Sequence, residues 1–174
     1  MKKTIFILIT IFLIYYIIGV ASEEIIKIPD EAIRFRVIAN SNNAQDQDVK
    51  YKVKDEVESY MAAILQNVDN IDESRVVIST NLDNINNKVT NVFNKNNYKI
   101  NYKVNFGLNY FPKKEFKGIT YDEGYYESLV ITIGEGKGDN WWCVLFPPLC
   151  MLEAEESTDV EYKSFVKEIV DKYI

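Results

Sequence analysis

The residue types best suited to chemistry or recognition are concentrated in one segment, residues 134–150, which reads GEGKGDNWWCVLFPPLC. It contains three of the seven glycines, both tryptophans, both cysteines and two of the four prolines. Glycine permits left-handed or closely approached backbone, which suits a tight connection between strands. A tryptophan beside such a loop is typical of a protein-binding surface, because its ring supplies a large contact area. The segment is therefore the first candidate for a functional site.

The two tryptophans of this segment are adjacent in a stretch with strand character. Neighbouring residues of a strand point to opposite faces, so Trp141 and Trp142 cannot share one core. We expect one ring to be buried and the other to lie at the surface or in a cleft, where it would anchor a partner. The alternative is an edge-strand tryptophan covered by the C-terminal helix. The candidate contact residues of the adjoining loop are Lys137, Asp139 and Asn140.

The two cysteines, Cys143 and Cys150, are seven residues apart with Pro147 and Pro148 between them. The prolines favour a turn that would bring the thiols together, and an extracytoplasmic location permits a disulfide. Two buried free cysteines that act as small hydrophobic residues are the alternative.

Several kinds of catalysis are excluded by composition. Histidine is absent, which rules out Ser-His-Asp triads, Cys-His dyads and histidine-ligated zinc. Two cysteines are too few for a four-thiolate metal site. Acid–base chemistry by two carboxylates remains available. A secreted hydrolase of cell wall or glycan, with Glu127, Glu135 and Asp139 near Trp142 as a sugar platform, is thus the alternative function to a non-enzymatic binding protein.

Other ligands are poorly supported by the sequence. The glycines at 134–138 lack the spacing of a phosphate-binding loop and do not open a helix. Glu135, Asp139 and Asn140 do not have the spacing of an EF-hand calcium loop. With 26 acidic and 20 basic residues, the net charge of −6 disfavours nucleic acid as the main partner. We therefore expect no cofactor, no resident metal and no catalytic residue.

The N-terminus has the pattern of an export signal. Lys2 and Lys3 precede an apolar run over residues 4–20, and Gly19 and Ala21 provide small residues for cleavage after Ala21. The alternative is an uncleaved membrane anchor, since the run lies at the short end of what spans a bilayer. Both interpretations place the body of the protein outside the cytoplasm. The predicted organisation is a signal or anchor at 1–21 and one domain at 22–174.

Hydrophobic periodicity outlines the elements of that domain. Strands are predicted at 33–38, 98–110, 126–133 and 141–146, with a bulge at Gly107 and a central position for 126–133. Helices are predicted at 44–66, 74–94 and 160–173. A short strand at the β-branched residues 76–78 is the alternative for the start of the second helix. The expected fold class is α+β: a single compact domain with an antiparallel sheet and helices packed on one face, preceded by the N-terminal hydrophobic helix.

Three stretches carry a resemblance to a known family. They are residues 33–41 (IRFRVIANS), residues 121–129 (YDEGYYESL), where Ser128 replaces the usual alanine, and the uninterrupted segment 134–150. The chain resembles the stage II sporulation protein R family, exported signalling proteins of endospore-forming bacteria. The resemblance implies synthesis in the forespore and export into the space between the two membranes. There the protein would act on a membrane-embedded aspartic protease of the mother-cell membrane, which cleaves the pro-sequence of sigma-E.

The resemblance implies a protein ligand that performs no reaction itself and takes no small-molecule substrate. Residues 4–20 would contact the membrane only if the signal is uncleaved. The candidate contacts with the protease then extend from the tryptophans and their loop to Arg34, Arg36, Asn40 and Ser41. The two arginines alternate with apolar residues of their strand, so ion pairing with carboxylates on the solvent face is their alternative role.

Overall fold

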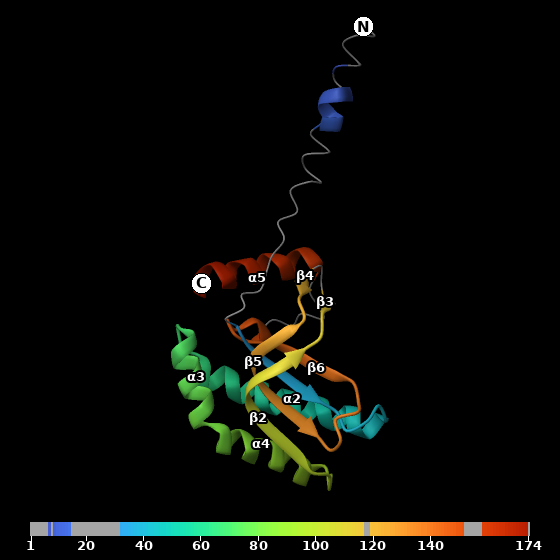
Figure 1. The fold of residues 1–174 in the computed structure, drawn as a ribbon, viewed down its shortest axis with the longest axis vertical. Helices are drawn as coiled ribbons and strands as arrows, with labels where there is room; N and C mark the ends of the chain where they lie inside the picture. Colours follow the sequence, from blue (N-terminus) through green and yellow to red (C-terminus); the bar gives the residue numbers. More distant parts are fainter. Residues whose placement is uncertain (1–6, 8, 15–31, 117–118, 152–157, 174) are drawn as a thin grey trace.

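The computed structural model describes residues 7, 9–14, 32–116, 119–151 and 158–173. Figure 1 shows the arrangement of the elements. In chain order they are β1 (Ile33–Ile38), α2 (Ala44–Leu65), α3 (Ile71–Thr80), α4 (Leu82–Lys95), β2 (Tyr102–Phe111), β3 (Lys114–Phe116), β4 (Ile119–Tyr121), β5 (Gly124–Ile133), β6 (Asn140–Phe146), the short 3-10 helix η1 (Leu149–Met151) and α5 (Asp159–Tyr173).

The main sheet has four strands in the order β2-β5-β1-β6, and β3 pairs with β4 in a separate two-stranded sheet. The α+β class is confirmed, and β5 is central as predicted. The expectation of a purely antiparallel sheet is wrong, because β1 and β5 run parallel while β2–β5 and β1–β6 are antiparallel. A parallel pair needs a long crossover connection. Three helices and three strands separate β1 from β5 in the chain and supply it.

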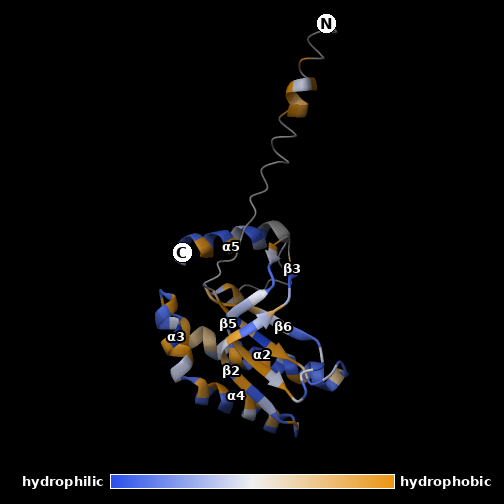
Figure 2. Ribbon diagram, in the orientation of Figure 1, coloured by the Kyte–Doolittle hydropathy of each residue, from blue (hydrophilic) through white to orange (hydrophobic). Residues whose placement is uncertain are grey.

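One face of the sheet packs against α2, α3 and α4 to form the larger core. The strands contribute alternate residues such as Phe35 and Ile131, and the helices contribute apolar stripes. Figure 2 shows the hydrophobic segments of the sheet and of these helices in orange. The buried helical residues are Val49, Val53, Val57, Met61, Ile78, Ile85, Val89, Val92 and Phe93. This side of the fold matches the predicted arrangement.

The opposite face is covered as well, which the sequence did not predict. Ile119 and Tyr121 of β4 and Tyr162 and Val166 of α5 form a second core with Val144. Strand β1 is therefore buried on both faces along much of its length, rather than half exposed. The prediction that all helices lie on one face is wrong for α5, since its buried residues belong to this second core.

Two local predictions also differ from the structure. The helix expected at 74–94 is interrupted at Asn81, whose side chain donates to the Val77 carbonyl at 2.8 Å and accepts from the Tyr60 hydroxyl at 2.7 Å. An asparagine that bonds nearby backbone competes with the helix. Gly107 makes no bulge, because the β2–β5 register is continuous from Tyr102 to Phe111.

At the N-terminus, residues 9–14 are helical and their apolar side chains are exposed, with Phe12 at 70%. No helix among the described residues is long and apolar enough to cross a membrane. Most of the predicted signal or anchor, and the predicted cleavage after Ala21, lie outside those residues.

Candidate partner-binding site

The glycine-rich segment is a loop that crosses over the end of another strand. Strands β5 and β6 lie on either side of β1, so residues 134–139, which connect them, must pass over the loop that follows β1. The two loops are hydrogen bonded: the Gly138 amide donates to the Ala39 carbonyl at 2.9 Å, and the Lys137 amide donates to the Asn40 carbonyl at 3.1 Å. We call residues 134–139 the crossing loop.

Close approach of two backbones explains why this loop contains so much glycine. Gly134 and Gly136 have φ values of +56° and +63°, in the left-handed region that side chains disfavour. At Gly138 the reason is space, because a Cβ would lie 2.3 Å from the Ser41 carbonyl oxygen. The sequence therefore encodes a tight crossing rather than a phosphate-binding loop. The loop amides of Glu135, Lys137, Gly138 and Asp139 already donate to residues 39–42.

Beneath the crossing loop, a buried carboxylate holds the segment after β1. Asp46, only 3% exposed, accepts hydrogen bonds from Asn40 Nδ2 at 2.8 Å, Ser41 Oγ at 2.7 Å, Asn43 Nδ2 at 3.1 Å and the Tyr98 hydroxyl at 2.5 Å. Burial alone would raise the pKa of Asp46, but these four hydrogen bonds outweigh it and place the pKa below its usual value. Burial, and then the hydrogen bond to Asp46, raises the pKa of Tyr98.

This network changes the interpretation of two predicted contact residues. Asn40 and Ser41 are half-buried and direct their polar atoms inward, and Asn40 Oδ1 also accepts from the Glu135 amide at 3.1 Å. They hold the crossing loop in place. Sequence reasoning missed Tyr98, which it assigned to a strand, and missed the burial of Asp46. The one available signal was an acidic residue in the first turn of a helix that follows several asparagines.

The tip of the crossing loop projects into solvent. The side chains of Glu135 and Lys137 are 70% and 75% exposed and form an ion pair at 2.5 Å, which contributes little to stability in water. Asp139 is also exposed, whereas Asn140 at the start of β6 is half-buried. The predicted loop residues thus form one accessible surface, made of Lys137, Asp139 and the neighbouring Glu135.

The two tryptophans lie on opposite faces of β6, as predicted. Trp141 packs on the larger core with its ring centroid 5.7 Å from that of Phe35, and the Lys54 Nζ lies 4.9 Å from the Trp141 centroid. Trp142 packs on the second core with its centroid 4.7 Å from that of Tyr121. Both rings are half-buried, so the structure does not divide them into the one buried and one accessible ring that we expected.

The two arginines of β1 stack on aromatic rings. Arg34 is 2% exposed, and its Cζ lies 3.3 Å from the Tyr126 ring centroid and 5.5 Å from that of Trp142. This is a cation–π arrangement inside the fold, so the expected solvent-facing position is wrong for Arg34. Arg36 is half-buried and donates to the Tyr110 carbonyl at 3.3 Å. Burial lowers the pKa of Arg36.

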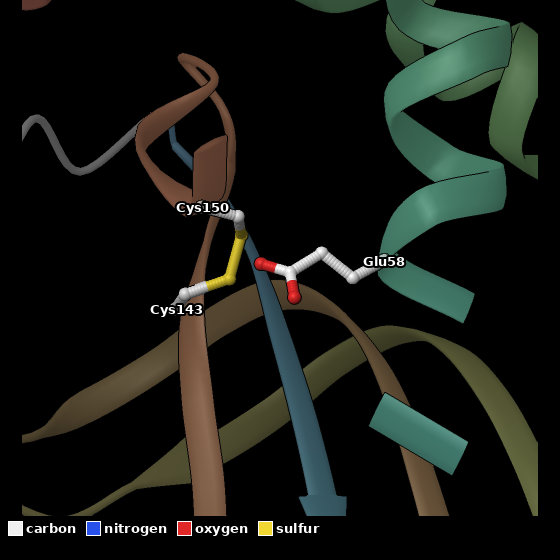
Figure 3. Close-up of side chains that lie close together, drawn as sticks. All are labelled: Glu58, Cys143 and Cys150. Carbon is white, nitrogen blue, oxygen red and sulfur yellow. A yellow bond between two sulfur atoms is a disulfide. The ribbon is translucent and has the colours of Figure 1, made fainter. Parts of the chain in front are cut away.

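Cys143 and Cys150 are joined by a disulfide, with their Cα atoms 5.5 Å apart. Figure 3 shows the Glu58 carboxylate of α2 beside the two sulfurs. These three residues are the group of possible metal ligands found in the described part of the chain, and their ligand atoms lie within 4.8 Å of one another. With both sulfurs in a disulfide, no thiolate is available for a metal. Glu58 instead pairs with Lys54 at 2.6 Å, and burial raises the pKa of its carboxyl despite that ion pair.

The structure separates Glu127 from the other two carboxylates of the alternative hydrolase. Glu127 lies on β5 and pairs with Arg75 of α3 at 2.7 Å. Glu135 and Asp139 belong to the crossing loop, beyond the other end of β5. Ile133 is six positions after Glu127 along the strand, a distance of about 20 Å. Glu127 therefore cannot form, with either loop carboxylate, a general acid and base pair around one glycosidic bond.

Comparison with known proteins identifies relatives. The sequence model of the family described as stage II sporulation protein R matches residues 29–156. The stage II sporulation protein R of Bacillus subtilis (strain 168) is 37% identical over 163 residues, which cover 88% of this chain and 73% of the relative. No solved structure matches the chain.

Proposed function

This chain belongs to the stage II sporulation protein R family, and from that premise we propose that it is an exported signalling protein of endospore formation. In this proposal it leaves the forespore, enters the space between the two membranes, and activates the membrane-embedded aspartic protease of the mother cell that cleaves pro-sigma-E. It breaks no bond itself. Family membership over most of the chain supports the role, and the crossing loop supports the location of the contact surface.

The proposed mechanism is preferential binding. A ligand that binds the active arrangement of the protease more tightly than the inactive one shifts the population by the ratio of the two affinities. A loop that is already ordered loses less entropy on binding than a mobile one. The hydrogen bonds that the loop amides donate to residues 39–42, and the network at Asp46, order the crossing loop before any partner arrives.

The predicted contact residues then have two different roles. Lys137 and Asp139 are accessible at the loop tip and contact the protease directly, followed in the chain by the half-buried Asn140, Trp141 and Trp142. Asn40, Ser41 and the buried Arg34 act through packing and hydrogen bonds, because their functional atoms face the interior. Arg36 is half-buried and lies on the second face of the sheet.

A co-expression experiment in a non-sporulating bacterium tests this proposal. Pro-sigma-E and the protease are produced with the wild-type chain, with a Lys137→Glu/Asp139→Lys double variant, or without the chain. We expect efficient cleavage with the wild-type chain, background cleavage without it, and much weaker cleavage with the double variant. Lys113→Glu is the matched control, since Lys113 is an exposed lysine at the other end of the sheet. Equal cleavage with and without the chain refutes the proposed role.

A further inference from the structure

Strand β2 forms one edge of the main sheet, and in the part of the chain that the structure describes no strand pairs with its outer side. It is ten residues long and carries Leu108 and Tyr110, whose side chains are 73% and 50% exposed. Its one charged residue is Lys103. Edge strands that remain unpaired are usually short or protected by charges, because their free backbone groups invite another strand. β2 has little of this protection.

The sequence of β2 is symmetric in residue class about Gly107. Residues 104–110 read VNFGLNY, which is apolar, Asn, apolar, Gly, apolar, Asn, apolar in either direction. The apolar residues occupy one face of the strand and the asparagines occupy the other, because side chains alternate along a strand. A strand with this symmetry presents the same pattern when it is turned around a two-fold axis through Gly107.

We infer that the partner of the β2 edge is a second copy of this chain, which pairs antiparallel with β2 about a two-fold axis at Gly107. In that register Val104 faces Tyr110 of the partner subunit, and Phe106 faces Leu108 of the partner subunit. On the other face, Asn105 faces Asn109 of the partner subunit. Cross-strand pairs of this kind stabilise sheets, and the exposed Leu108 would be covered by an apolar neighbour. The two four-stranded sheets become one continuous sheet.

Charge and helix placement are compatible with this pairing. Lys103 lies opposite Phe111 of the partner subunit, so the two lysines are about 26 Å apart and no like charges face each other. The helix beside β2 is α4, where the Tyr102 hydroxyl donates to the Asn86 carbonyl at 2.9 Å. The exposed surface of α4 is mostly asparagine and threonine. A pair of acidic chains can therefore approach along this edge without strong repulsion.

Sedimentation of the full chain in a mild detergent tests the inference independently of the proposed function. We expect the wild type to form a dimer whose fraction rises with protein concentration, and Leu108→Lys to sediment as a monomer. Val76→Lys is the control, because Val76 is 60% exposed on α3 and does not belong to β2, so we expect it to leave the dimer intact. A monomeric wild type, or a Leu108→Lys variant that remains dimeric, overturns the inference.

The register has its own test, which does not depend on the stability of the lysine variant. Asn105→Cys and Asn109→Cys chains with different tags are mixed under air with a copper catalyst. Because residues 105 and 109 face each other across the proposed axis, we expect a disulfide-linked pair that contains both tags. If Asn105→Cys chains cross-link with one another as efficiently as with Asn109→Cys chains, the axis at Gly107 is contradicted.

Discussion

At the scale of single residues, Asp46 is the group on which the candidate site most depends. Its carboxylate accepts four side-chain hydrogen bonds, three of them from the segment that supports the crossing loop. An asparagine at this position would place an amide donor against the donors of Asn40 and Asn43. Because unmade hydrogen bonds in a buried site are costly, we expect Asp46→Asn to lower the free energy of unfolding by about 2–4 kcal/mol. Urea denaturation checks this, with the exposed Asp48→Asn on the same helix as the control.

The pH dependence of stability follows from the same group. The pKa of Asp46 is lower in the folded protein than its ordinary value of 3.8. A depressed pKa contributes stability that is present above the unfolded value and is lost as the pH falls through the folded value. The difference in unfolding free energy between wild type and Asp46→Asn should therefore be constant near neutral pH and shrink below pH 3.8. A difference that does not change in acid would contradict the charged network.

Arg34 provides a second residue-scale prediction. Its guanidinium carbon lies 3.3 Å from the Tyr126 ring centroid and near two further rings, in a position that is 2% exposed. Lysine keeps the charge but loses the planar stacking and is more strongly hydrated. We expect Arg34→Lys to destabilise the protein by about 2 kcal/mol, within the range for desolvated cation–π contacts. Thermal denaturation of the two variants checks this. Arg36→Lys, at a half-buried position, should lower the free energy of unfolding by clearly less than Arg34→Lys does.

At the scale of elements, the crossing of the β5–β6 connection over β1 determines where the candidate surface lies. Gly138→Ala places a Cβ 2.3 Å from the Ser41 carbonyl oxygen, which is backbone and cannot rotate away. We expect this change to cost about 2 kcal/mol through overpacking and to displace the loop. In Gly124→Ala the new Cβ would lie 3.3 Å from the end of the Tyr126 ring, which is the milder control. Equal stability of the two variants would contradict the tight crossing.

The disulfide fixes the end of β6 in the same region. Replacing Cys143 and Cys150 by serine opens a short covalent loop, and we expect a loss of about 2.5 kcal/mol of unfolding free energy by the chain-entropy relation. Denaturation of the double variant, compared with reduced and oxidised wild type, checks this value. A double variant as stable as the oxidised wild type would show that the turn at Pro147 and Pro148 needs no covalent support.

Local pattern predicted most elements and little of their arrangement. Alternating residues revealed β1 and β2, and the apolar stripe revealed α2, because these signals depend on near neighbours in the chain. The parallel pairing of β1 with β5 and the break at Asn81 depend on distant contacts, so no local pattern contains them. The candidate site was predicted in part as well, because the composition of residues 134–150 indicated the loop and the tryptophans. The burial of Arg34 follows from β4 and α5, which cover the second face.

At the scale of the whole molecule, the described domain is a folded scaffold that holds one exposed loop at the end of a mixed sheet. Its hypothesised role requires no reactive group, since a ligand that shifts a conformational equilibrium acts by shape and charge alone. Family membership connects this scaffold to sporulation. The contact with the protease is a proposal that a reconstituted system can test without the other events of spore formation.

The most direct measurement is the rate of pro-sigma-E cleavage in membrane vesicles that contain the purified protease, as purified chain is added to the face that the intermembrane space would contact. We predict a rate that rises with chain concentration and saturates, while the chain alone cleaves nothing. Saturation is the expected signature of a binding equilibrium. A rate that is unchanged by the chain, or cleavage by the chain without the protease, would contradict the account.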